Sequence, residues 1–458
     1  PGNVGSATAA TGFNVANSLR FNSGSSDRLN KTLGTPTNNL KWTYSFWIKR
    51  SKLGEEVAIT EALNDSQNKG IILFRSDDKL EILDLISDSY VMQKKTNRVF
   101  RDTASWYHIV FSNDSTAGSP DLKIYVNGVE ETSFATDNEY SQNQAGSFNS
   151  ALANHIGASA SSRFSNCYFS QFVFIDGLAL AADQFGEFDS DSAIWKPIDV
   201  SGLTFGDNGF FLKFEESGTG TDANGMGADT SGNDNHFAVN NLTAIDQATD
   251  TPTNNFCTLN PLAKYSNAPT LSEGNMQAVA GGNDWYHTRG SMGFSKGKWY
   301  FEVLFTGGTA TNYYTGVTDE TCTMNDTDAH AQTGTSIFYN GGGGEMRVDG
   351  TTTTNDYGDF NASSDILGVA CNFDDGQITI YKNNSAIVTN YSLSTTKNLL
   401  FPMGVMYGAS NVIKFNFGGC SAFTVSSAAA DADGYGAFEY APPSGYFALC
   451  TKNLAEYG

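Results

Sequence analysis

The chain has 458 residues, of which 40% are hydrophobic and 13% aromatic, so it can bury more than one globular core and is not a disordered protein. It carries 27 Lys and Arg against 49 Asp and Glu, a formal net charge of -22, and this acidity opposes binding to nucleic acid and to anionic membranes. No apolar run is long enough to cross a bilayer. We therefore expect no nucleic-acid partner and no membrane insertion.

The first half of the chain alternates apolar and polar residues in short runs that end at Gly, Asn, Asp or Ser. The run LKWTYSFWIKR is an example, because its alternation places four large side chains on one face: Trp42, Tyr44, Phe46 and Ile48. Similar runs continue to residue 216, with one plausible helical turn at 181–188. Short strands with turn residues at this spacing are typical of an antiparallel sandwich.

A second series of such runs follows a Pro-, Thr- and Asn-containing segment and ends at Phe417. The sequence therefore predicts an all-β protein made of two tandem antiparallel β-sandwiches with little helix. The expected division is an N-terminal arm at 1–14, a first sandwich at 15–245, a connector at 246–275, a second sandwich at 276–440 and a C-terminal tail at 441–458.

Both halves contain the same local pattern. Trp-Tyr opens a strand at residue 106 and again at residue 299, and an Ile-Tyr strand ending in Asn-Gly or Asn-Asn follows each time. We predict that both tryptophans face a core. We also predict that each Asn turn is a tight hairpin with the positive φ angles of a type I′ turn.

The six cysteines are scattered, without a C-x-x-C motif and without histidines at metal-ligand spacing. Four of them stand among apolar or strand-like residues, which indicates buried free thiols that pack as small hydrophobic side chains. A disulfide framework is the alternative. The cysteines are Cys167, Cys257, Cys322, Cys371, Cys420 and Cys450.

The motifs of the first half, in order, include SLRFNSGSSDRL, WTYSFWIKR, LKIYVNGVEETSF and GADTSGNDNHF. This series resembles a laminin-G-like domain of the concanavalin A-like lectin/glucanase superfamily over about residues 15–245. GKWYFEVLF, DILGVACNFDDGQITIYKNN and PMGVMYGASNVIKFNFG resemble a SPRY domain over about residues 276–440. The resemblance implies that both sandwiches are jelly rolls.

The pairing of these modules, with the connector DTPTNNFCTLNPL and the ending PPSGYFALCTKNL, resembles large structural proteins of marine bacteriophages. It implies a non-enzymatic virion protein at the particle surface, a tail fibre or capsid appendage that binds host-surface glycan or protein, other virion proteins or neighbouring copies. The alternative is a secreted bacterial adhesin or glycan-binding module, located outside the cell.

Enzymatic activity is not expected. A retaining glucanase needs two carboxylates about 5 Å apart over one cleft. Glu81 and Asp84 are three residues apart and so point to opposite sheet faces, and the adjacent pair Glu215 and Glu216 fails for the same reason. His108 lies between core-like positions, which favours a hydrogen-bonded structural histidine over a general base.

One turn-like segment, GADTSGNDNHF, concentrates oxygen-bearing side chains around glycines. Hard oxygen ligands on a tight turn suit Ca²⁺, and laminin-G-like domains often carry this ion at the sandwich rim. The alternative is an Asx-rich turn held by bonds from side chains to the backbone. The candidate ligands are Asp229, Asn233, Asp234 and Asn235.

Aromatic residues beside the predicted loops of the second sandwich are candidate ligand-binding residues, because such side chains stack on sugars or enter protein grooves. The resemblance to SPRY domains points to the same stretches. The alternative is that these rings edge the core. The candidates are Trp285, Tyr286, Tyr313, Tyr314, Tyr339 and Tyr357.

The terminal segments PGNVGSATAATG (1–12) and CTKNLAEYG (450–458) have too few large apolar residues to fold alone. They are therefore either disordered or ordered by a neighbour, and we expect a trimer or a higher symmetric assembly of this chain. A monomer with frayed ends is the alternative.

Overall fold

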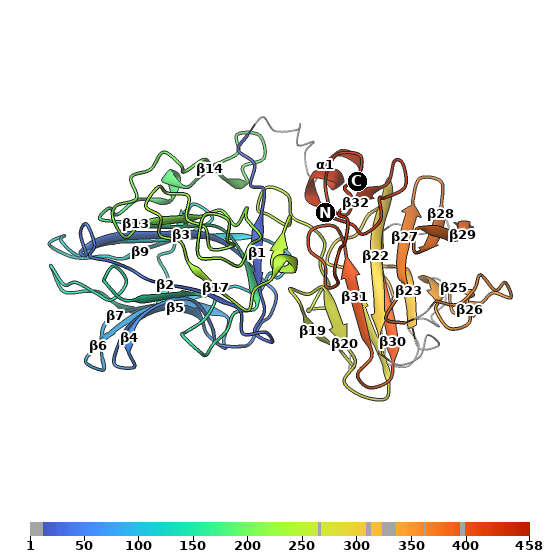
Figure 1. Ribbon diagram of the computed structural model, residues 1–458, viewed down its shortest axis with the longest axis horizontal. Coiled ribbons are helices and arrows are strands. Elements are labelled where there is room, and N and C mark those ends of the chain that lie inside the picture. The colour runs from blue at the N-terminus through green and yellow to red at the C-terminus, as the bar shows by residue number, and fades with distance from the viewer. Residues whose placement is uncertain (1–11, 264–266, 308–312, 323–335, 361, 394–398) are drawn as a thin grey trace. The chain divides into compact units, whose positions relative to one another are not determined.

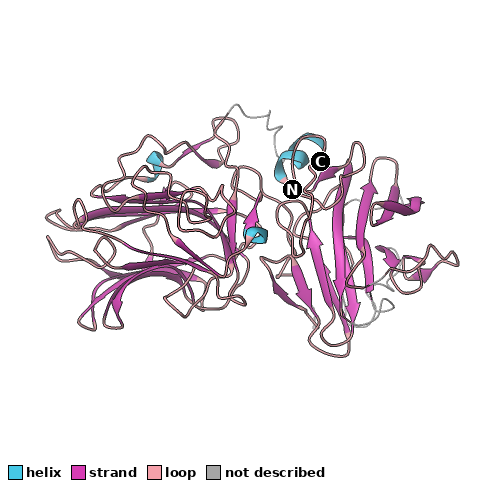
Figure 2. Cartoon of the chain, in the orientation of Figure 1, coloured by secondary structure: helices cyan, strands magenta, loops and turns pink. Residues whose placement is uncertain are grey.

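The computed structural model describes residues 12–458 except 264–266, 308–312, 323–335, 361 and 394–398. The described residues are strands and loops, apart from one short α-helix and two 3-10 helices (Figure 2). They form two compact units, and the chain passes from the first to the second between Thr253 and Asn254. The predicted all-β class with two tandem sandwiches is confirmed. No helix in the described part is both long and apolar enough to span a bilayer.

The first unit consists of two large antiparallel sheets packed face to face (Figure 1). One sheet has the order β10 (Val129–Glu130), β9 (Lys123–Val126), β8 (Tyr107–Asp114), β3 (Lys41–Arg50), β13 (Cys167–Asp176), β1 (Ser18–Phe21) and β18 (Gln247–Ala248), with β16 (Phe210–Leu212) paired to β13. The other has the order β11 (Phe134–Asn138), β7 (Ser89–Val99), β6 (Lys79–Ile86), β5 (Asn68–Phe74), β4 (Val57–Asp65), β12 (Ala153–Ile156), β2 (Arg28–Thr32) and β17 (Ala238–Asn240). The remaining elements are the hairpin of β14 (Gly186–Phe188) and β15 (Trp195–Pro197) and the 3-10 helices η1 (Ala182–Gln184) and η2 (Ala244–Asp246).

The core of the first unit lies between its two sheets. The four large residues predicted on one face of β3 all belong to it, together with side chains of the opposite sheet such as Ile72 and Phe74. The Phe46 ring stacks on that of Phe172, with 4.9 Å between their centroids. Period-two alternation along β3 thus decides which side chains leave water.

The second unit also has two sheets. The larger has the order β19 (Thr270–Ser272), β20 (Gln277–Val279), β31 (Val412–Asn416), β22 (Lys298–Thr306), β27 (Ile366–Asn372), β28 (Gln377–Lys382) and β29 (Ser385–Ser392), with β32 (Phe447–Ala448) parallel to β22. The smaller has the order β21 (Trp285–Arg289), β30 (Leu400–Tyr407), β23 (Tyr313–Asp319), β24 (Ser336–Asn340), β25 (Met346–Val348) and β26 (Thr351–Thr352). The α-helix, α1 (Thr451–Tyr457), follows β32.

The two Trp-Tyr pairs do not have the same orientation. Trp299 is 1% exposed and shares a face of β22 with Phe305, which packs on Tyr313 of the opposite sheet, so it faces the core as predicted. The prediction is wrong for Trp106. Here Tyr107 packs against the core cluster, whereas the Trp106 indole lies on the outer side of the sheet and donates its Nε1–H to Asp250 at 3.1 Å.

Both Asn turns and the cysteines agree with the sequence predictions. The φ angles are 49° at Asn127 and 78° at Gly128 in the first turn, and 47° at Asn383 and 68° at Asn384 in the second. All six cysteines are buried free thiols.

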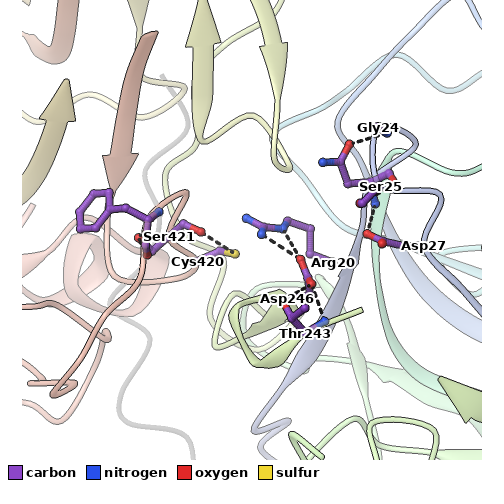
Figure 3. Close-up of polar contacts among 10 residues, drawn as sticks. Arg20, Gly24, Ser25, Asp27, Thr243, Asp246, Cys420 and Ser421 are labelled. Carbon is purple, nitrogen blue, oxygen red and sulfur yellow. Dashed lines mark hydrogen bonds and ion pairs between the residues drawn. The ribbon is translucent and has the colours of Figure 1, made fainter. Parts of the chain in front are cut away.

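The first compact unit extends past residue 245, into the predicted connector. In η2, Asp246 forms an ion pair with Arg20 at 2.9 Å, as Figure 3 shows. The next element, strand β18, pairs with β1. Asp250 forms a 2.7 Å ion pair with Lys49, and both side chains are 1% exposed. The described residues after Asn254 pack instead within the second unit, where Phe256 bridges to Cys450.

The C-terminal tail was expected to lack a core of its own, yet it is ordered by its own sandwich. Asn453 of α1 is fully buried, and its Nδ2 donates to Asp431 Oδ2 and to the Ala448 carbonyl, each at 2.8 Å. The rings of Phe447 and Tyr457 stack with centroids 3.9 Å apart. Residues 1–11 of the predicted arm lie outside the described residues.

Candidate functional site

The six-stranded sheet of the second unit has an outer face rich in aromatic and basic side chains. Tyr313 packs on Phe305 of the other sheet, with ring centroids 4.6 Å apart, so alternation turns the next residue, Tyr314, away from that sheet. The residues in register with Tyr314 on the neighbouring strands share this outer face.

The strand register places two arginines at the two ends of one transverse row. Arg289 is paired with Met403, Met403 with Gly316, Gly316 with Phe338, and Phe338 with Arg347. All five residues therefore lie on the same face. Four strand spacings, roughly 19 Å, separate the two arginine backbones.

Three aromatic rings lie beside this row. The Trp285 ring centroid is 5.7 Å from that of Tyr314 and 5.1 Å from that of Tyr407, and the Arg347 guanidinium lies 6.0 Å from the Tyr314 centroid. Tyr407 is 37% exposed, which opens this group to solvent. We call the set Trp285, Tyr314, Tyr407, Arg289 and Arg347 the aromatic–arginine face.

Among the described residues, one guanidinium nitrogen of each arginine of this face lacks a hydrogen bond. The Nε atoms of Arg289 and Arg347 are buried and have no hydrogen-bond partner among the described residues. The Arg289 guanidinium lies 4.7 Å from the Phe401 ring centroid instead. A guanidinium held over a ring keeps its planar donors available, so this arrangement suits a ligand that offers carboxylate or other oxygen acceptors together with an apolar surface.

Of the six predicted ligand-binding aromatics, the structure brings Trp285 and Tyr314 together. Tyr313 and Tyr339 are fully buried, and their hydroxyls donate to backbone carbonyls, so the prediction is corrected for these two: they fill the core rather than a loop. Tyr286 is 9% exposed and lies on the opposite face of β21 from Trp285. Tyr357 is half-buried in the loop after β26.

Sequence reasoning missed Tyr407, Arg289 and Arg347. A signal for Tyr407 was present, because the alternation in FPMGVMY places Phe401, Met403, Val405 and Tyr407 on one side of a strand. The two arginines gave no comparable signal, since only the register across five strands brings them into one row.

The predicted calcium ligands form a hydrogen-bonded turn. The Asp229 carboxylate accepts bonds from the backbone N–H groups of Phe211, Ser231 and Asn235 and from the Ser231 hydroxyl, at 2.8 to 2.9 Å. Asn233 and Asn235 donate to backbone carbonyls, while the Asp234 side chain is 90% exposed. These are the contacts of the alternative, an Asx-rich turn. The calcium site stays a prediction.

In the described part of the chain, no group of three or more His, Cys, Asp or Glu side chains is arranged to hold a metal ion. The two carboxylates considered as a pair for glycoside hydrolysis lie on opposite faces of their strand. Asp84 lies on the core side of β6, bound by Tyr140 and Ser147, and Glu81 lies on the outer side with Arg75.

His108 is a structural residue, fully buried on the outer side of β8. Its Nδ1 accepts the Nε1–H of Trp195 at 2.9 Å, and its Nε2 is 2.9 Å from the Ser45 hydroxyl. Burial lowers the pKa of His108 to about 3. The imidazole is therefore neutral at physiological pH and unsuited to act as a solvent-exposed general base.

Comparisons with known proteins match one family in each half of the chain. Residues 22–181 match the family described as the concanavalin A-like lectin/glucanases superfamily, and residues 298–420 match the SPRY domain. The chain contains a concanavalin A-like domain followed by a SPRY domain. No curated protein matches it.

Three solved structures illustrate the similarity. The SPRY domain of human HERC1 is 15% identical, covering 32% of this chain and 90% of its own, with a TM-score of 0.28. The TRIM65 PSpry domain is 14% identical, covering 35% and 88%, with a TM-score of 0.29. A native heptameric SAP-like pentraxin from Limulus polyphemus is 16% identical, covering 38% and 81%, with a TM-score of 0.28.

Proposed function

We propose that this chain is a non-enzymatic virion structural protein of a marine bacteriophage, a tail fibre or capsid appendage whose two domains bind host-surface glycan or protein, other virion proteins or further copies of the chain. Concanavalin A-like and SPRY domains are typically binding modules, which supports binding as the function to test. The order of the modules and the connector and terminal motifs support the virion setting by resemblance.

The aromatic–arginine face is the observation that carries the binding role. Within a chain of net charge -22, it presents two arginines without a hydrogen-bond partner for Nε among the described residues, next to partly exposed rings. Guanidinium groups beside aromatic rings bind carboxylate oxygens through their planar donors and stack on apolar surfaces. Aromatic and Arg side chains are also those that most often dominate protein interfaces.

The binding role is tested with the double variant Arg289→Ala/Arg347→Ala in the whole chain. We expect its co-sedimentation with host cells to fall at least about tenfold, since two charge-assisted contacts are removed. Arg98→Ala is the control, because this arginine lies on the first unit and is 47% exposed. Equal sedimentation of both variants and the parent chain would refute the role of this face.

The virion setting is tested separately by imaging purified particles. We expect density for this chain at the particle surface, in symmetric copies. Particles without such density, combined with the chain in the culture medium of a bacterium, would instead establish the secreted adhesin.

A further inference from the structure

A cavity of about 370 Å³ opens on the outer side of the first unit. It lies between the β9–β10 hairpin and the β14–β15 hairpin. Its walls include the rings of Tyr125, Phe188 and Trp195 and the carboxylates of Asp183 and Glu187. The Tyr125 and Trp195 rings pack on a small cluster outside the main core, formed by residues such as Val110 and Phe211. Nothing in the proposed function uses this cavity.

Two of the rings form a corner. Phe188 and Trp195 are directly opposite each other in the β14–β15 pair, and their rings are 4.9 Å apart at an interplanar angle of 68°. Phe188 is 52% exposed, so one wall of the corner faces the open cavity. Nearly perpendicular ring faces beside a third ring can surround a compact group from several sides.

The Trp195 indole is held in place by the protein before any ligand arrives. Its Nε1–H donates to His108, so its polar edge points inward. A Cβ atom at Gly128 would come within 2.3 Å of the indole, and one at Gly186 within 2.6 Å, so both positions require glycine for this packing. A wall fixed in this way loses little entropy on binding.

The charge of the lining is negative. Asp183 and Glu187 are exposed, and no Lys, Arg or His side chain lines the cavity among the described residues. The nearby Lys196 lies 3.0 Å from Asp189 and 3.3 Å from Glu187, so it partly neutralises Glu187 and leaves Asp183 as the lining carboxylate without an ion pair among the described residues. Apart from the Tyr125 hydroxyl, the lining side chains offer no free hydrogen-bond donor, which disfavours a sugar, whose hydroxyl groups need donors as well as acceptors.

We propose that this cavity binds a quaternary ammonium group, such as the trimethylammonium of choline or of a methylated lysine. Ring faces attract a cation through their quadrupole, and the Asp183 carboxylate adds a long-range attraction. The methyl groups of such a cation bury against the aromatic walls without a need for hydrogen-bond donors. The inference concerns the concanavalin A-like domain and is independent of the aromatic–arginine face.

The test is calorimetric titration of the whole chain with choline and with its neutral tert-butyl analogue, in which carbon replaces nitrogen. We expect the analogue to bind about 5- to 30-fold more weakly, as the loss of cation–π attraction implies. Phe188→Ala and Asp183→Asn should each weaken choline binding, whereas Tyr90→Ala, a 50% exposed tyrosine on β7, should not. Thermal melting checks that each variant is folded.

Further ligands distinguish the sources of this group. Choline and trimethyl-lysine should bind alike, and phosphocholine more weakly, because its phosphate is repelled by Asp183 and Glu187. The proposal is overturned if the neutral analogue binds as well as choline, if Phe188→Ala leaves choline binding unchanged, or if a methyl galactoside binds at this cavity and choline does not.

Discussion

The Lys49–Asp250 pair shows what a buried ion pair demands at the level of single residues. Both side chains are 1% exposed, and the Asp250 carboxylate also accepts the Trp106 indole N–H. Taking two charges out of water is costly, and their mutual attraction offsets that cost only while both are present. Removal of one partner therefore lowers the free energy of unfolding much more than removal of both.

We expect Asp250→Ala to lower the free energy of unfolding of the first unit by about 3 to 5 kcal/mol, because it removes the carboxylate that pairs with the buried Lys49 ammonium. The double variant Lys49→Met/Asp250→Ala should lose less. Glu55→Ala is the control, since the Lys52–Glu55 pair is more than 40% exposed and such pairs contribute about 0 to 1 kcal/mol. Urea titration measures all three. If Asp250→Ala and Glu55→Ala cost the same, the pair does not stabilise the fold in this way.

His108 gives the first unit a dependence on pH. Burial lowers its pKa from 6.5 to about 3, so below pH 6.5 the unfolded chain binds a proton that the folded chain does not. The free energy of unfolding therefore falls as the pH falls through this window, by about 1.4 kcal/mol per pH unit.

Between pH 7.5 and pH 4.5, His108 alone should remove about 3 kcal/mol from the stability of the first unit. His108→Phe should be less stable at neutral pH, because Trp195 and Ser45 lose their partner, but its stability should fall less steeply with acid. Urea titrations of both proteins at several pH values give the two slopes. Parallel slopes would exclude His108 as their source.

Single residues also show how far the sequence leads at this scale. Alternation separates Tyr313 from Tyr314 but does not say which of the two faces the core. That choice depends on a contact across the sheets, between Tyr313 and Phe305, and on the bonds from the Tyr313 hydroxyl to backbone carbonyls. Alternation likewise does not say whether the Trp or the Tyr of each pair faces the core, which is why the prediction is correct for Trp299 and wrong for Trp106.

At the scale of elements, the turn of the β9–β10 hairpin needs glycine for two reasons, its backbone conformation and a contact with a residue far away in the sequence. Gly128 has a φ of 78°, which an Asn-Gly turn predicts, and it also lies against the Trp195 indole, which no local pattern predicts. Gly54 offers a matched comparison, because its φ is 76° and nothing lies within 4 Å of a Cβ atom there.

We expect Gly54→Ala to cost about 1 kcal/mol, the strain of a left-handed conformation in a residue with a Cβ. Gly128→Ala should cost about 1 to 3 kcal/mol more, because the added methyl group must displace the indole. Thermal melting with tryptophan fluorescence measures both variants. Equal losses would mean that the Trp195 packing adds nothing to the stability of the hairpin.

Strand existence and the Asn turns could be read from the sequence, because both depend on neighbours within a few residues. The packing of the C-terminal tail on the second sandwich could not be read from the sequence. Helix α1 is held by Asn453, which reaches Asp431, and by the stacking of Phe447 on Tyr457. The aromatic–arginine face was only half found for the same reason, since its register spans strands that are far apart in sequence.

At the scale of the whole chain, the position of the boundary between the two units has a measurable consequence. Residues 246–253 contain β18, Asp246 and Asp250, which serve the first unit. A fragment cut after residue 245 keeps Arg20 and Lys49, whose side chains are 1% exposed, but loses the Asp246 and Asp250 carboxylates that pair with them.

We expect a fragment of residues 12–253 to unfold cooperatively and one of residues 12–245 to be unfolded. Loss of these two buried ion pairs costs about 6 to 10 kcal/mol together, which is comparable to the whole stability of a domain. Circular dichroism and urea titration of both fragments measure the difference. If the shorter fragment melts like the longer one, the two ion pairs are dispensable.

The association of copies of this chain should depend on its net charge. We propose that the chain forms trimers or larger symmetric assemblies, in which weak binding sites gain about 10² to 10⁴ in avidity. The C-terminal tail packs on its own sandwich, so its order does not require a second copy. The remaining terminal candidate is the segment 1–11.

Copies that each carry a net charge of -22 repel one another, and the repulsion reaches about 30 Å at 0.01 M salt but only about 10 Å at 0.1 M. We therefore expect light scattering to give the monomer mass of 49.2 kDa at low salt and a multiple of it at higher salt. A chain without residues 1–11 should remain a monomer at both salt concentrations. The removed segment has no charged side chain, so it is the part of the chain that can approach a neighbouring copy with least repulsion. A full-length chain that is monomeric at every salt concentration would contradict the proposed assembly, and a multimer that survives removal of the arm would place the contacts on the sandwiches.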